Sequence, residues 1–181
     1  GPDARDVADG FDLSKATTPY PALWGHDATE IISMYQHSNA HLQPLSKPKA
    51  GRPLRKTAAL WPKAADLLIA ERLWLETTRV FALVTPLSVL SNMWWPVTLA
   101  ERSENARKAM ALWLNSTLGF TLALGHRVET RGPWIKFKKP TLMGMPVLDV
   151  KALDESKLEE LAQAFDELAG RPLCPFPQIA Q

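Results

Sequence analysis

The stretch Arg79-Val-Phe-Ala-Leu-Val-Thr85 decides the fold class, because it has the composition of a strand buried inside a sheet. β-Branched and aromatic side chains favour strands, and after Arg79 this run carries both kinds without a charge. Pro86 follows at once and is expected to end the strand, because proline has no backbone N–H to donate. A partner strand is predicted at residues 66–70, which are largely apolar.

Two further segments are predicted to extend this sheet. Residues 89–99 are expected to be extended, and Pro96 within them indicates a sheet edge or a bulge. Trp134-Ile-Lys-Phe-Lys138 alternates apolar and polar residues, which is typical of a half-buried strand with its lysines facing solvent. Short apolar segments at 120–124 and 141–148 flank this strand, and residues 28–36 have a weak helical spacing.

Two helices are predicted to accompany the strands. Ser103 is typical of an N-cap for a helix over 104–118, and Gly119 is expected to end it. The apolar face of this helix would consist of Ala106, Met110, Trp113, Leu114 and Leu118. The last helix begins after Asp154 and ends at Gly170, with an apolar stripe made of Leu158, Leu161, Phe165 and Leu168. We expect this stripe to dock onto the domain itself or onto the rest of a larger protein.

Together these patterns predict an α/β fold: a twisted, mostly antiparallel or mixed sheet with packed helices and an appended C-terminal helix. We divide the chain into three parts. Residues 1–19 would be an irregular lead-in that opens with Gly1-Pro2, which is typical of the remnant of a removed tag. Residues 20–150 would form the α/β domain, and residues 151–181 the C-terminal helix and tail.

Composition indicates a soluble globular protein in a reducing compartment. Of the 181 residues, 46% are hydrophobic and 22% are charged, which is ordinary for a globular domain. The only cysteine is Cys174, so no intrachain disulfide is possible. No apolar run is long enough to span a membrane. We therefore expect a cytoplasmic protein without a membrane partner.

The net charge of only +2 hides a marked separation of charge along the chain. A first basic cluster occupies a long Pro-rich loop without any acid between 43 and 65, and consists of Lys47, Lys49, Arg52, Arg55, Lys56 and Lys63. A second basic cluster surrounds a turn and consists of Arg127, Arg131, Lys136, Lys138 and Lys139, with Trp134 among them. Residues 149–171 instead carry seven acids against three bases. Such asymmetry favours nucleic acid as a partner, held by the two basic clusters and avoided by the acidic helix.

Each basic cluster has a simpler interpretation as well. Basic loops are common on any surface, and charges on the outer face of an edge hairpin prevent sheets from associating. If the second cluster does contact DNA, its loop arginines would read base edges, with guanine as the favoured target, and its lysines would hold phosphates.

One order of elements resembles a known family. A helix containing Leu114-Asn115-Ser116, an exit containing Met145-Pro146-Val147 and a long helix from Asp154 follow one another, and Leu90–Val97 precedes them as a strand. This order resembles target-recognition domains, which occur in type I specificity subunits and in adenine-N6 DNA methyltransferases of restriction-modification and phage-defence systems. The resemblance covers residues 20–170. It implies sequence-specific DNA binding.

The catalytic motifs of that family do not occur in this sequence. Adenine-N6 methyltransferases carry an (Asn/Asp/Ser)-Pro-Pro-(Tyr/Phe) motif and a glycine-rich cofactor loop. The only tyrosines here are Tyr20 and Tyr35, and neither follows two prolines. We therefore expect that this chain is no enzyme by itself and binds no cofactor. The resemblance implies that an S-adenosylmethionine-dependent methyltransferase domain or subunit transfers the methyl group elsewhere.

Other residue types that often carry chemistry are better explained structurally. Most of the seven tryptophans are expected in the core, with Trp24 and Trp134 the best candidates for exposure. His37 and His41 have a helical spacing, but no further ligand completes a metal site. Asn115 and Ser116 would satisfy local backbone or pack against the sheet.

The sequence thus predicts a module that binds double-stranded DNA sequence-specifically and presents a target adenine to a methyltransferase domain located elsewhere. The alternative is a protein–protein interaction domain that docks through the stripe of the C-terminal helix. In that case the basic loops would serve only solvation.

Overall fold

The computed structural model describes residues 4–74, 76, 79–100 and 103–175. Its main sheet has six strands in the order β1-β3-β2-β6-β4-β7. The strands are β1 (Phe11–Ser14), β2 (Pro21–Leu23), β3 (Ala40–Pro44), β4 (Ala65–Ala70), β6 (Ala82–Ser91) and β7 (Trp94–Val97). Only the β2–β6 pair is parallel, and the other described pairs in this sheet are antiparallel. The predicted mixed, mostly antiparallel sheet is therefore confirmed.

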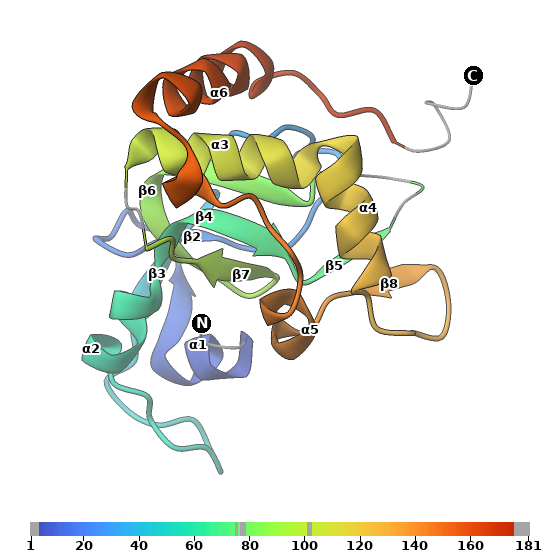
Figure 1. The fold of residues 1–181 in the computed structure, drawn as a ribbon. Helices are drawn as coiled ribbons and strands as arrows, with labels where there is room; N and C mark the ends of the chain where they lie inside the picture. The colour runs from blue at the N-terminus through green and yellow to red at the C-terminus, as the bar shows by residue number, and fades with distance from the viewer. Residues whose placement is uncertain (1–3, 75, 77–78, 101–102, 176–181) are drawn as a thin grey trace.

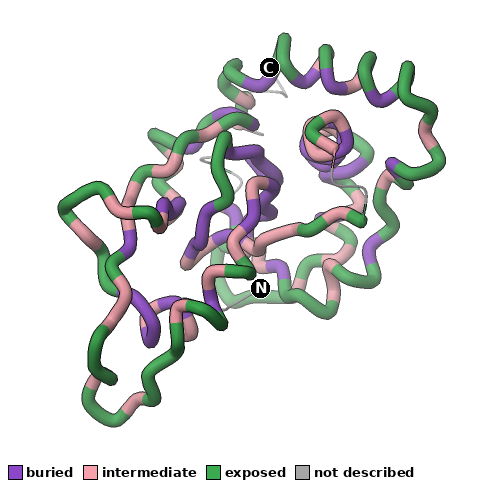
Figure 2. The backbone as a smooth tube through the Cα atoms, turned by 90° about the vertical axis from the view of Figure 1, so that its left-hand side faces the viewer, coloured by how far each residue is buried: buried purple, intermediate pink, exposed green. Residues whose placement is uncertain are grey.

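Two helices are stacked in layers on one face of this sheet (Figure 1). Helix α3 (Glu104–Asn115) contacts β6, and helix α6 (Glu155–Leu168) lies on the other side of α3. Figure 2 shows the same order from the side, with α3 between the sheet and α6. Both helices begin as predicted, because the Ser103 and Asp154 side chains accept hydrogen bonds from the backbone N–H groups of Ala106 and Lys157.

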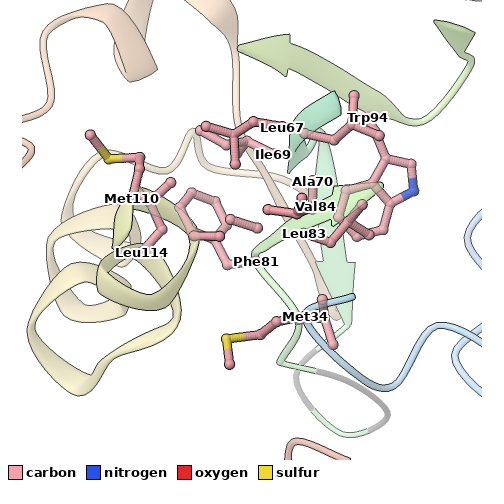
Figure 3. Packing of buried hydrophobic residues seen from close by; sticks show 14 of the residues in the cluster. Met34, Leu67, Ile69, Ala70, Phe81, Leu83, Val84, Trp94, Met110 and Leu114 are labelled. Atoms are coloured by element: carbon pink, nitrogen blue, oxygen red, sulfur yellow. The ribbon is translucent and has the colours of Figure 1, made fainter. Parts of the chain in front are cut away.

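The main core lies between the sheet and α3. Phe81, directly before β6, is fully buried beside Met110 and Leu114 of α3 (Figure 3). Its ring also meets Phe120 and Phe137 at centroid distances of 6.0 and 4.9 Å. The stretch that decided the fold class from sequence is therefore the stretch on which helix and sheet meet.

The prediction that Pro86 ends its strand is wrong. Strand β6 continues through Pro86 to Ser91, and its register against β4 shifts between the Ala65 and Leu67 pairs. Residues 86–88 are exposed at this irregularity and have no register partner among the described residues of β4, so a proline is tolerated there. The far end of β6 can thus pair with β2, which joins the two halves of the sheet.

The helix predicted over 104–118 ends three residues earlier, and Gly119 does not stop it. A second helix, α4 (Thr117–Gly125), begins at once and absorbs the apolar segment 120–124. Ser116 has an extended backbone, and its hydroxyl accepts a hydrogen bond from Gly119 N, so it caps α4. A Cβ on Gly119 would lie 2.2 Å from the Trp113 carbonyl oxygen, so glycine permits the tight corner between the helices.

The irregular lead-in predicted within residues 1–19 is also wrong. Helix α1 (Ala4–Gly10) precedes β1, which pairs with β3 at the edge of the main sheet. Val7 and Phe11 are buried in a second, smaller core together with Leu42 and Leu60. The polar composition of this segment concealed it, because only a few of its side chains enter that core.

The remaining elements connect these layers. Helix α2 (Thr57–Leu60) and the 3-10 helix η1 (Trp61–Lys63) end the long Pro-rich loop. Strands β5 (Arg72–Trp74) and β8 (Trp134–Lys136) form a separate antiparallel pair, which confirms a strand within 134–138. Helix α5 (Lys139–Met143) and the 3-10 helix η2 (Val150–Ala152) occupy the segment before α6, around the short apolar segment at 141–148. Residues 28–36 form turns, bends and an isolated β-bridge at Tyr35, so the weak helix expected there is wrong.

Candidate nucleic-acid interface

Half of the first basic cluster is held by acids from the N-terminal elements. Lys49 Nζ lies 2.8 Å from Asp12 Oδ1, Arg55 Nη2 lies 3.0 Å from Asp6 Oδ1, and Arg52 Nε contacts Asp9, whose side chain is buried. The backbone N–H of Arg55 also donates to the Asp9 carbonyl. These contacts hold the Pro-rich loop against α1 and β1, so Lys49, Arg52 and Arg55 have a structural role.

The other half of the first cluster stays open to solvent. Lys47, Lys56 and Lys63 are exposed, and none of them forms an ion pair with a described residue. They lie on the loop, before α2 and at the end of η1, respectively. This part of the molecule can therefore offer three lysines to an anion.

The second basic cluster is almost entirely free. Arg127, Arg131, Lys138 and Lys139 are exposed and have no ion pair within the described part of the chain. Lys136 alone is paired, with its Nζ 3.3 Å from Glu71 Oε1. These residues come from one continuous segment that runs from the end of α4 through β8 into α5 (Figure 1).

Local structure fixes the positions of these cations. The Arg127 guanidinium donates to the Leu124 carbonyl at 2.7 Å, at the C-terminal end of α4, where a positive charge is favourable. Lys138 and Lys139 stand at the start of α5, whose first turn is closed by hydrogen bonds between Thr141 and the Lys138 backbone. Lys139 also borders an apolar cavity of about 260 Å³ between β7 and α5.

Trp134 is the exposed aromatic residue of this segment, as predicted. It pairs across strands with Trp74, and 39% of it is exposed. The Arg72 guanidinium carbon lies 5.5 Å from the centroid of the Trp134 ring. Arg72 was not among the predicted site residues. In the run Arg72-Leu73-Trp74 it stands two positions before Trp74, and this spacing would place both side chains on the same face of a strand.

The two basic clusters do not merge into one patch. Figure 1 places the Pro-rich loop and the β8–α5 segment at separate corners of the molecule, both away from α6. The acidic helix α6 therefore lies apart from both basic clusters. Part of its charge is neutralised within the chain, where Lys108 Nζ lies 2.8 Å from Glu104 and 2.9 Å from Asp166.

The apolar stripe of α6 is largely occupied by the chain itself. Leu158 and Phe165 are buried against the core that includes α3, and Leu161 packs beside them. Leu168 alone of the stripe is exposed, at 38%. The expectation that the helix docks onto this domain is confirmed, and little of the stripe is left for another protein.

The residues with a structural interpretation have structural contacts. Asn115 is buried and hydrogen-bonded to the backbone of β6. Trp24, which was expected to be exposed, is instead half-buried against the smaller core. His37 and His41 do not share a helix: His41 lies in β3 with its Nδ1 3.1 Å from the Thr18 carbonyl, and His37 stacks edge-on with Tyr35.

Comparison with known proteins leaves the function to be argued from these contacts. No protein-family model matches the chain, and neither does any curated protein or solved structure. Among the described residues, no helix combines the length and apolar character needed to cross a membrane. Nor do three His, Cys, Asp or Glu side chains of that part of the chain gather where they could hold a metal ion. The family resemblance stays a prediction.

Proposed function

We propose that this chain binds double-stranded DNA as the target-recognition part of an adenine-N6 DNA methyltransferase of the restriction-modification or phage-defence type. One observation carries the proposal: Arg127, Arg131, Lys138 and Lys139 are exposed on one continuous segment and have no acidic partner among the described residues. Cations without an acidic partner are available to phosphates, and each neutralised phosphate adds salt-dependent affinity. The acidic helix α6 lies on another side of the molecule, so we expect DNA to approach the side that carries this basic segment.

Within this proposal the cations have different tasks. Lys138 and Lys139, at the start of a helix, would hold phosphates and set the position of the chain on the duplex. Arg131 lies on an exposed loop beside Gly132, whose φ of +94° shapes the turn, and it would reach a base edge. Lys47, Lys56 and Lys63 would add phosphate contacts at a second position along the DNA.

The chain would contribute affinity and specificity and no chemistry. Methyl transfer from S-adenosylmethionine to the target adenine would take place on a catalytic domain elsewhere in the polypeptide or on a partner subunit. A base that is to be methylated must leave the stack, so the recognition part has to hold the duplex while that happens.

The proposal is tested by fluorescence anisotropy with a labelled duplex at about 50 and about 200 mM salt. We expect binding that weakens steeply with salt. The double variant Lys138→Ala/Lys139→Ala should lower the salt slope by about two, because roughly one unit is lost for each phosphate contact.

The matched control is Lys151→Ala/Lys157→Ala, which removes the same charge beside and within the acidic α6. It should leave the salt slope unchanged. Absence of binding at the lower salt concentration refutes the proposed function. Equal effects of the two double variants refute the assignment of this face.

A further inference from the structure

The outer face of the β5–β8 pair combines two indole rings with two cations. Trp74 lies opposite Trp134 and Arg72 lies opposite Lys136, while Leu73 between them is fully buried. Because side chains alternate along a strand, these four share the face that points away from the core. The two indole centroids are 5.5 Å apart, and the ring of Trp134 keeps 39% exposure.

Only one of the two cations on this face has an acidic partner among the described residues. Like charges directly opposite each other destabilise an antiparallel pair, and a two-stranded sheet is marginal by itself. Glu71 compensates Lys136, but Arg72 has no ion pair with a described residue. Its guanidinium donates to the Met93 thioether sulfur at 3.0 Å, which is a weak acceptor. Arg72 therefore retains the capacity to bind an anion.

We infer that this face binds an unpaired nucleobase together with the phosphate beside it. The base stacks on the exposed part of Trp134, and Arg72 and Lys136 face the phosphate. Stacking on aromatic side chains accepts any base, and a neighbouring arginine strengthens it. Inside an intact duplex the ring faces of the bases are covered by their neighbours. The preferred substrate is therefore DNA with an unpaired base, an inference that rests on the proposed binding to DNA.

The test compares two fluorescein-labelled duplexes that differ only by one bulged adenine. We expect the wild-type chain to bind the bulged duplex more tightly. Trp134→Ala should weaken binding to the bulged duplex by roughly 5- to 150-fold, the range of one base–aromatic stack, and leave the paired duplex almost unaffected. Trp134→Phe should retain part of the preference. Leu118→Ala, at a 62% exposed apolar position on α4, is the matched control and should change neither affinity.

A second measurement reports the stack directly. With 2-aminopurine at the bulge, its fluorescence should be quenched on binding to the wild-type chain, less by Arg72→Gln, and not by Trp134→Ala. Thermal melting shows whether Trp134→Ala is folded. If it is not folded, the stacking inference is tested by 2-aminopurine quenching with the wild-type chain and with Trp134→Phe instead.

The outcomes separate the two ideas. Equal affinity for both duplexes, without quenching, overturns this inference and leaves the proposed function standing. Failure to bind either duplex at low salt overturns both.

Discussion

At the residue scale, Asn115 connects helix α3 to the start of strand β6 through three of its four side-chain hydrogen bonds, and the fourth stays within α3. Its Oδ1 accepts from the N–H groups of Phe81 and Ala82 at 2.8 and 3.2 Å. Its Nδ2 donates to the carbonyls of Ala82 and Ala111 at 2.7 and 2.8 Å. The side chain is buried, so these backbone groups have no water to replace it.

Replacing Asn115 should therefore destabilise the fold strongly. In Asn115→Ala, buried backbone donors at the start of β6 lose their acceptor, and each such group costs about 1–3 kcal/mol. We expect the free energy of unfolding, measured by urea titration, to fall by about 2–4 kcal/mol. Asn105→Ala, on the same helix but only half-buried, should change it by less than about 0.5 kcal/mol. Similar losses for both variants would contradict a connecting role for Asn115.

His26 makes stability depend on pH. Its ring stacks on Trp94 with a centroid distance of 4.9 Å, and its Nε2 is buried without a hydrogen-bond partner among the described residues. Burial is the main cause that lowers the His26 pKa below 6.5, and the positive charge of Arg72 lowers it further. Protonation of the ring thus favours the unfolded chain.

The direction of this effect follows from linkage. Well above pH 6.5 the ring is neutral in both states and its full contribution is present. As the pH falls from 6.5 towards the folded-state pKa, the unfolded chain takes up a proton first, and stability is lost. We expect urea unfolding to give a steeper decline over this window for the wild-type chain than for His26→Phe. An identical decline in both would rule out His26 as its source.

At the element scale, the corner between α3 and α4 depends on a single close approach. Ser116 ends one helix and caps the next, and Gly119 brings α4 against the last turn of α3. Phe120 and Ala123 of α4 are buried as a result. A larger side chain at Gly119 should therefore displace the whole of helix α4.

Two glycines of α4 give a matched pair of substitutions. A Cβ at Gly119 meets the Trp113 carbonyl oxygen at 2.2 Å, whereas a Cβ at Gly125 meets nothing within 4 Å. We expect Gly119→Ala to lower the free energy of unfolding by about 1–3 kcal/mol, as overpacking does. Gly125→Ala should leave it unchanged or raise it by up to about 1 kcal/mol, because alanine favours helix. Chemical denaturation measures both, and equal effects would show that the corner is not tight.

Elements set by local chemistry were the ones that the sequence predicted well. Ser103 and Asp154 mark helix starts because a cap needs only the next turn of backbone. The errors arose where tertiary contacts override a local signal. Pro86 is tolerated inside β6 by a register shift, and Gly119 provides close packing where a helix end was predicted. Neither the register shift at Pro86 nor the close packing at Gly119 can be predicted from the few residues around each position.

At the scale of the whole molecule, the fold decides which cations remain free. The sequence predicted both basic clusters and the opposing acidic helix from composition alone. It could not predict that Asp6, Asp9 and Asp12 reach across to the Pro-rich loop, because that pairing requires the β1–β3 register and the packing of α1. The candidate DNA-binding site consequently contains fewer free cations than the sequence predicted, and it is centred on residues 127–139.

The ion pair between Asp12 and Lys49 leads to a last prediction, which concerns the effect of freeing Lys49. Asp12→Asn would remove the partner of Lys49 at a position where both side chains are partly exposed, so the fold should tolerate it. If the Pro-rich loop contacts DNA, the freed lysine should tighten duplex binding and steepen its salt dependence by up to about one unit of slope. Glu167→Gln on α6 makes the same change in net charge away from the loop. Anisotropy titration of both variants distinguishes the cases: equal small gains would mean that only net charge matters and that the loop does not touch DNA. A gain confined to Asp12→Asn would place the loop at the interface, with the N-terminal acids limiting its affinity.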